Sequence, residues 1–213
     1  AGADVVEINA WNHPVPPIVD ADALVVLGGS MSCQDDAEAP WLAPTRQLIS
    51  RTVRAGTPFL GICLGHQLAT VALGGQVCTS DHFCLGAAEM HLTPEGKKDP
   101  LLSVYDGHRG IHFNNDAAVV LPEDAVLLAR DPTGQIEAVR FAERAWGVQF
   151  HPECTPEIFD AWTIGHGEKE WQQRLPWSEA VTVAETVRRD IDTVNAEEAF
   201  AARFQELIDP EKR

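Results

Sequence analysis

The segment 58–69 restricts the fold more than any other part of this 213-residue chain. An apolar run leads into Gly61-Ile62-Cys63-Leu64-Gly65, and the residues that follow have the composition of a helix. A sharp turn from a strand into a helix, called a nucleophile elbow, needs glycine two residues before and after its central residue, because larger side chains would collide with the neighbouring strand and helix. The pattern therefore predicts a buried strand over 58–62, a tight turn with Cys63 at its apex, and a helix that runs to about Leu73.

The rest of the chain alternates between strand and helix patterns. Apolar runs bounded by turn residues recur at 24–27, 58–62 and 145–150, which is typical of strands buried on both faces of a sheet. Between the first two runs, residues 41–55 carry apolar side chains at near-helical spacing, and Gly56 follows where a helix C-cap is expected. This alternation predicts an α/β fold, with a mostly parallel sheet in the middle of three layers and helices on its faces.

The middle and the two ends of the chain depart from this alternation. Short strands separated by turns are expected at 91–93, 117–120, 125–129 and 136–141, which indicates a small antiparallel β insertion or edge within residues 77–139. Residues 178–208 are rich in alanine and glutamate and predict one or two helices that cover a sheet face. Residues 1–7 look like the turn and strand that follow a helix, so a further strand and helix are expected upstream. The length suits a single domain over residues 1–213.

Charge and cysteine content exclude several classes of protein. The formal net charge of −16 disfavours a nucleic-acid partner and an anionic membrane surface. No uninterrupted apolar run reaches the roughly 18 residues of a membrane-spanning helix. Five cysteines without a CxxC pair predict neither a disulfide framework nor a structural zinc site, and they favour a reducing, cytoplasmic setting. His108 and His112 are four residues apart, but glycines among them make a helical metal site improbable, so a loop role is expected and no metal is predicted.

Two parts of the chain together predict a nucleophilic site. A cysteine at the start of a helix is favoured as thiolate by the helix dipole, and the following N–H, that of Leu64, can donate to an oxyanion, an interaction worth roughly 3 kcal/mol. The second part is Gly147-Val148-Gln149-Phe150-His151-Pro152-Glu153, where a strand ends in a histidine with a carboxylate two residues later. In extended backbone these two side chains point the same way, so Glu153 can orient His151 as the base for Cys63.

The segments GICLGHQLA and GVQFHPE together resemble the class I glutamine amidotransferases, especially their GMP-synthetase-like members. The resemblance implies a flavodoxin-like fold, Cys63 as the nucleophile, His151 as general base and acid, Glu153 as its orienter, and a γ-glutamyl thioester intermediate. Residues 27–32, Leu-Gly-Gly-Ser-Met-Ser, resemble the glycine-rich loop of the family, whose other oxyanion donor corresponds here to Gly29.

The same resemblance assigns roles to the helix after Cys63. Gln67, one helical turn past the nucleophile, resembles the family residue that helps to hold the substrate glutamine, whereas His66 is expected on the helix surface. Residues 111–116, Ile-His-Phe-Asn-Asn-Asp, stand where relatives often have Ser-His-Gly-Asp or Trp-His-Gly-Asp, and Cys84 stands where many relatives have an acidic residue. Cys84 is expected to be structural.

The expected reaction is hydrolysis of the glutamine side-chain amide to glutamate and ammonia, with no cofactor and no metal. The chain lacks an ATP-binding G-x-x-x-x-G-K-[ST] motif, so an ammonia-accepting synthetase is expected to be another protein. Two alternatives stay open. The same triad could serve a γ-glutamyl peptidase or amidase that acts on other γ-glutamyl compounds, or the domain could be a non-catalytic regulatory or interaction domain.

Overall fold

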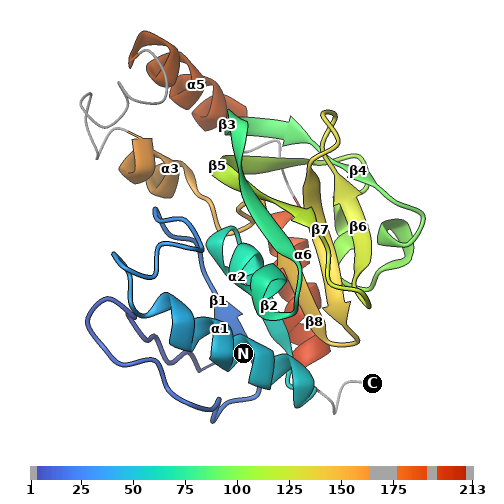
Figure 1. Ribbon diagram of the computed structural model, residues 1–213. Helices are drawn as coiled ribbons and strands as arrows, with labels where there is room; N and C mark the ends of the chain where they lie inside the picture. The colour runs from blue at the N-terminus through green and yellow to red at the C-terminus, as the bar shows by residue number, and fades with distance from the viewer. Residues whose placement is uncertain (1–3, 164–176, 191–195, 210–213) are drawn as a thin grey trace.

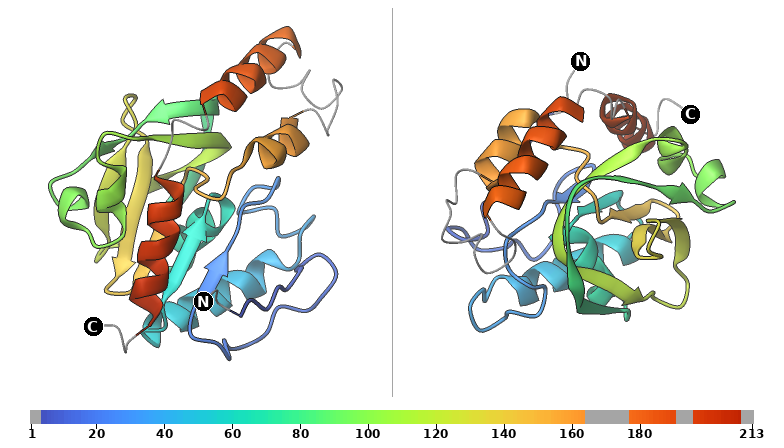
Figure 2. Two further views of the ribbon diagram at one scale, coloured as in Figure 1. Left: turned by 180° about the vertical axis from the view of Figure 1, so that it is seen from behind. Right: turned by 90° about the horizontal axis from the view of Figure 1, so that it is seen from above.

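The computed structural model describes residues 4–163, 177–190 and 196–209. A six-stranded sheet forms the middle layer, with helices on both faces, and a separate two-stranded sheet lies beside it (Figures 1 and 2). The strands are β1 (Leu24–Val26), β2 (Phe59–Ile62), β3 (Gln76–Glu89), β4 (His91–Leu92), β5 (Arg109–Val120), β6 (Val126–Arg130), β7 (Ile136–Ala142) and β8 (Ala145–Val148). The helices are α1 (Leu42–Arg54), α2 (Leu64–Ala72), α3 (Pro156–Thr163), α5 (Trp177–Asp190) and α6 (Glu197–Ile208), with short 3-10 turns at Gly96–Lys98 and Leu102–Tyr105.

The main sheet joins a parallel part to an antiparallel part. Its order is β1-β2-β8-β7-β6-β4, in which β1, β2 and β8 are parallel and the remaining pairs are antiparallel. The expected α/β fold class is confirmed. Strands β4, β6 and β7 extend this same sheet, whereas β3 and β5 pair with each other in a second sheet.

Local sequence signals account for the elements around the nucleophile. Every residue of β2 and β8 is buried, as their continuous apolar sequences predict. The first strand differs, because Val25 of β1 is 45% exposed and, among the described strands, β1 pairs with β2 alone. Helix α1 ends as expected before Gly56, which has φ +73 and donates its N–H to the carbonyl oxygen of Val53.

Helices cover the two faces of the sheet with different clusters of apolar side chains. Helices α1 and α2 lie on one face, and α6 lies on the other (Figures 1 and 2). Phe200 and Phe204 of α6 are buried against Tyr105, Trp146 and Phe150. The helices expected within 178–208 are therefore present, although residues 191–195 of that stretch lie outside the described residues.

Strand β3 and the first half of β5 were not expected from the sequence. The register between them shifts twice, once between Thr79 and Cys84, so the apolar and polar positions of β3 do not alternate regularly. Helix α5 packs on this sheet where Gly86, with φ +106, leaves room for Val183 and Val187.

The N-terminal residues do not form the expected strand. The described part of residues 1–7 has no regular secondary structure, and Val5 and Val6 are each 84% exposed. Without a paired strand, the backbone groups of such a segment have no ladder of hydrogen bonds to join. Among the described residues, no helix is both long enough and apolar enough to cross a membrane.

Candidate active site

Cys63 occupies a strained turn between β2 and α2. Its backbone has φ 50 and ψ −106, the one positive φ among the described residues that are not glycine. The glycines of the turn leave no space for a side chain: a Cβ on Gly61 would lie 2.6 Å from the Gly65 carbonyl, and a Cβ on Gly65 would lie 2.0 Å from the Val26 oxygen. The nucleophile elbow expected from G-x-C-x-G is confirmed in its geometry, and strain of this kind is typical of functional sites.

His151 is held from three directions just after β8. Its backbone N–H donates to the Ile111 oxygen at 2.8 Å, and its Nδ1 lies 2.8 Å from Oε1 of Glu153. The Trp162 ring lies against the imidazole, with centroids 4.6 Å apart. The expected contact between His151 and Glu153 is present, and the Nδ1 contact leaves Nε2 as the ring atom that is free to exchange a proton.

Cys63 and His151 meet on either side of Gly28. A Cβ placed on Gly28 would lie 3.5 Å from Cβ of Cys63 and 3.0 Å from Cε1 of His151. Burial lowers the pKa of His151, but the negative charges of Cys63 and Glu153 outweigh burial and raise the pKa from 6.5 to about 10. His151 Nε2 is buried without a hydrogen-bond partner among the described residues. This arrangement suits a thiolate paired with an imidazolium.

The two residues expected to supply the oxyanion donors, Gly29 and Leu64, are in contact through the Leu64 side chain. Leu64 is the first residue of α2, where backbone N–H groups have no acceptor within the helix. A Cβ on Gly29 would lie 2.8 Å from Cδ2 of Leu64, so the glycine-rich loop packs on the start of the helix. Within that loop it is Gly28 whose backbone lies against Cys63 and His151, while Gly29 lies against Leu64 and Met31.

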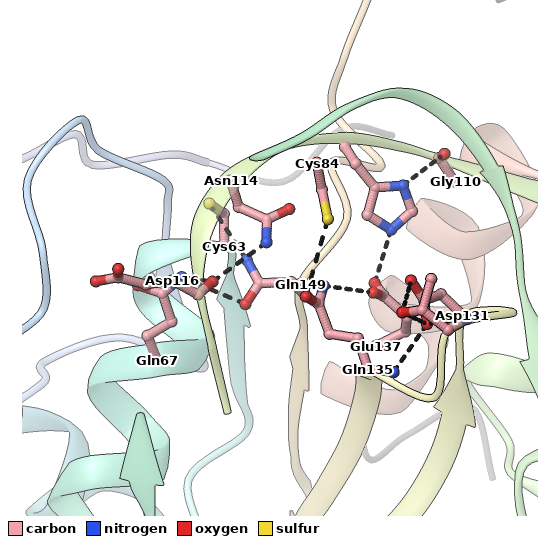
Figure 3. Close-up of polar contacts among 12 residues, drawn as sticks. Cys63, Gln67, Cys84, Gly110, Asn114, Asp116, Asp131, Gln135, Glu137 and Gln149 are labelled. Carbon is pink, nitrogen blue, oxygen red and sulfur yellow. Dashed lines mark hydrogen bonds and ion pairs between the residues drawn. The ribbon is translucent and has the colours of Figure 1, made fainter. Parts of the chain in front are cut away.

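Gln67 belongs to a buried chain of amides that ends at the nucleophile (Figure 3). Its Nε2 donates to the backbone oxygen of Asp116 at 2.9 Å and to Oε1 of Gln149 at 3.3 Å. Gln149 Nε2 in turn donates to the Cys63 sulfur at 3.6 Å. Gln149 was not expected as a site residue. The available signal was its position directly after the fully buried strand β8 and two residues before His151.

Two histidines differ from their expected settings. His66 was expected on the helix surface, but it is fully buried, fills the space beside Gly147 and stacks on Phe141. Burial lowers its pKa to about 4, so it is neutral at pH 7. The surface position was wrong because α2 is covered on that side by the sheet.

His112 was expected in a loop but lies in β5, where its Nε2 is 2.7 Å from Oε2 of buried Glu137. The loop assignment was wrong because β5 begins at Arg109 and pairs with β3 through this region. Nearby, the Cys84 sulfur lies 3.8 Å from Oε1 of Gln135, and burial raises the pKa of the Cys84 thiol. The described residues include no cluster of three His, Cys, Asp or Glu side chains that could hold a metal ion.

Comparison with known proteins identifies a family and several relatives that this chain resembles in sequence. Residues 3–165 match the family model described as glutamine amidotransferase class-I. The chain is 32% identical over 161 residues to the glutamine amidotransferase-like protein YfeJ of Salmonella typhimurium, which covers 73% of this chain and 66% of YfeJ. It is 30% identical over 153 residues to one of the subunits of the glutamine-hydrolysing GMP synthase of Halobacterium salinarum, covering 70% of this chain and 76% of that relative. A match to the GMP synthase of Tolumonas auensis, at 29% identity, covers 91% of this chain but 38% of that protein.

Solved structures agree with the fold. The crystal structure of SMU.1228c superposes with a TM-score of 0.82 at 25% identity, covering 98% of this chain and 90% of that one. A glutamine amido transferase from Methylobacillus flagellatus has a TM-score of 0.73 at 22% identity, covering 97% of this chain and 81% of that one.

Proposed function

Because the chain belongs to the class I glutamine amidotransferase family, we propose that it hydrolyses the side-chain amide of glutamine to glutamate and ammonia through Cys63, His151 and Glu153. The observation that carries this proposal is the meeting of Cys63 and His151 across Gly28, with Cys63 in a strained turn at a helix N-terminus. Relatives named as glutamine-hydrolysing support the substrate class. The described residues are proposed to belong to one domain.

The first half of the reaction forms a thioester. The Cys63 thiolate attacks the amide carbon of glutamine, and the carbonyl oxygen gains the negative charge, which the N–H groups of Leu64 and of Gly29 in the glycine-rich loop are proposed to stabilise. The His151 imidazolium gives its proton to the amide nitrogen. The C–N bond then breaks, ammonia leaves, and a γ-glutamyl thioester on Cys63 remains.

The second half regenerates the enzyme. Neutral His151 removes a proton from water, which attacks the thioester carbon. The C–S bond breaks, and the sulfur departs as a thiolate beside the newly formed imidazolium. The product carboxylic acid loses its remaining proton to solvent and leaves as glutamate. Glu153 keeps the ring in one orientation and stabilises its charged form in both halves.

The proposed fate of the ammonia follows from the names of the relatives. The chain spans 38% of the Tolumonas GMP synthase, and the Halobacterium relative is named as one of the subunits of such an enzyme. We infer that the ammonia is passed to an acceptor-binding synthetase that lies outside residues 1–213.

The test measures ammonia and glutamate released from glutamine, γ-glutamyl peptides and γ-glutamyl amines. Cys63→Ala should lower turnover by at least about 10³-fold, because the nucleophile is lost while binding remains. Cys78→Ala, at an exposed cysteine on β3, is the matched control and should keep wild-type turnover.

Each result has a distinct meaning. Cysteine-dependent turnover of glutamine supports the proposal, and turnover restricted to other γ-glutamyl compounds would replace it with a peptidase or amidase. Labelling by a glutamine-analogue diazoketone tests the site without turnover. If Cys63 remains unlabelled with candidate synthetase partners present, the catalytic proposal is wrong.

A further inference from the structure

Resting on the function proposed above, we propose that Gln149 donates a hydrogen bond that stabilises the Cys63 thiolate, and that Gln67 is the positioning residue that sets the direction of the Gln149 amide. The two residues thus form a relay from the backbone of β5 to the reacting sulfur (Figure 3). This assigns Gln67 a structural partner within the site in addition to the substrate contact expected for it.

Gln149 is held in place by the packed core. Its side chain is completely buried, and its backbone N–H donates to the Glu137 oxygen at 2.8 Å. Its Nε2 lies 3.6 Å from the Cys63 sulfur, a suitable distance for an N–H donor to sulfur, whose atom is larger than oxygen. The side chain therefore adopts its contact with Cys63 as part of the packed core, so little ordering is needed during the reaction.

The orientation of the two glutamine amides in the relay follows from a backbone oxygen, which can only accept a hydrogen bond. The two ends of a glutamine amide have nearly the same shape, so their assignment depends on hydrogen-bond partners. The backbone oxygen of Asp116 accepts but cannot donate, so the end of Gln67 that faces it must be the NH₂ group. The same NH₂ group reaches Oε1 of Gln149, which turns the NH₂ group of Gln149 toward Cys63.

A neutral amide donor suits this position chemically. A buried thiolate is costly unless it is paired and hydrogen-bonded, and Cys63 is 5% exposed. His151 stabilises the thiolate but must also give its proton away, whereas an amide N–H keeps its proton throughout. The Gln149 bond is therefore available when the thiolate attacks and again when the sulfur leaves the thioester.

The charged side chains near Cys63 and the relay have hydrogen-bond or ion-pair partners of their own, and Gln149 is the amide that donates to the sulfur. His151 and Glu153 approach from the segment after β8 and supply the imidazolium and its partner. Of the acidic residues that contact the relay, the Asp116 carboxylate accepts from Thr79, and the Glu137 carboxylate is paired with His112 and Gln135.

The test measures alkylation of Cys63 by iodoacetamide as a function of pH, followed by mass spectrometry of the peptide that contains Cys63. Gln149→Met keeps the volume but removes the donor, and we expect the midpoint of the alkylation profile to rise by about one pH unit, which lowers the rate below the midpoint roughly tenfold. The plateau at high pH reports access to the sulfur and should stay unchanged.

Two further variants separate a relay from loss of packing. Gln67→Met should raise the midpoint by a smaller amount, because Gln149 is then free to turn its oxygen toward the sulfur. The double variant should have the midpoint of Gln149→Met alone, since Gln67 acts only through Gln149. Thr79→Val removes a neighbouring hydrogen bond outside the relay and should leave the midpoint unchanged.

An unmoved midpoint in Gln149→Met would overturn the proposal, and additive shifts in the double variant would overturn the positioning role of Gln67. If circular dichroism shows that Gln149→Met does not fold, the Gln67→Met variant tests the proposal instead. A raised alkylation midpoint would support the relay, and an unchanged midpoint would overturn it. Alkylation needs no substrate, so failure of the relay is distinguishable from failure of glutamine hydrolysis.

Discussion

The orientation of His151 depends on contacts made by atoms that do not take part in proton exchange. Its backbone is bonded to Ile111, its Nδ1 to Glu153, and its ring face lies against Trp162. Each contact comes from a different segment, and together they leave Nε2 as the ring atom that exchanges the proton. The charge of the ring is then set by its neighbours, because burial alone would make it neutral.

Glu153→Gln should lower the pKa of His151 from about 10 toward its ordinary value of 6.5, because one of the two negative partners is removed. In the wild type, the raised pKa stabilises the folded state fully below pH 6.5, and this contribution is lost as pH rises to about 10. In the variant, this stabilisation of the folded state should be lost completely at a lower pH than in the wild type. NMR titration of the histidine ring resonances measures both proteins. His66 is an internal control whose pKa of about 4 should not move, and equal titration of His151 in both proteins would contradict the prediction.

At the scale of elements, the elbow depends on three backbones that approach closely. Strand β1, strand β2 and helix α2 pack together at Gly61 and Gly65, where any side chain would overlap backbone atoms. The close approach places Cys63 at the end of β2, and its N–H donates to the Val148 oxygen of β8 at 2.8 Å. This bond ties the nucleophile to the strand that leads to His151.

Gly65→Ala should destabilise the protein by more than about 3 kcal/mol, because the added Cβ would lie 2.0 Å from a backbone oxygen that has no room to move. Urea denaturation followed by circular dichroism measures the free energy of unfolding. The matched control is Gly56→Ala, where φ is +73 but no atom lies within 4 Å of the added Cβ, and its cost should be about 1 kcal/mol. Equal costs at the two positions would show that the elbow is less tightly packed than described.

At the scale of the molecule, α6 packs against core residues that are distant from it in the sequence. Phe200 lies 5.6 Å from the ring of Tyr105 and 6.4 Å from that of Phe150, measured between centroids. Phe150 immediately precedes His151. The apolar cluster that α6 covers therefore includes the residue next to the catalytic histidine. Helices α1 and α2 bury the opposite face, which makes the sheet the middle of three layers (Figure 2).

Phe200→Ala should cost about 3–5 kcal/mol, because a buried aromatic ring is removed from a packed aromatic cluster and leaves a cavity. Arg203→Ala, on the exposed side of the same helix, should change the free energy of unfolding by no more than about 0.5 kcal/mol. Thermal and urea unfolding test both variants. A small effect of Phe200→Ala would mean that α6 contributes little to the stability of the domain.

The sequence by itself determined the features that depend on neighbouring residues. The elbow at Cys63, the end of α1 at Gly56 and the buried strands β2 and β8 all follow from steric and apolar patterns within about ten residues. The pairing of His151 with Glu153 was also predicted from their spacing, although Pro152 and Glu153 lie in a turn and not in the extended backbone that was expected.

Only the tertiary structure decided which distant groups meet. The irregular register of β3 hid its pairing with β5, and the cover over α2 placed His66 in the core. The contact between Gln149 and Cys63 joins residues 86 positions apart, and the direction of its amide depends on a backbone oxygen in a third segment. Such contacts are set by how whole elements pack, and no local pattern of residue types encodes that packing.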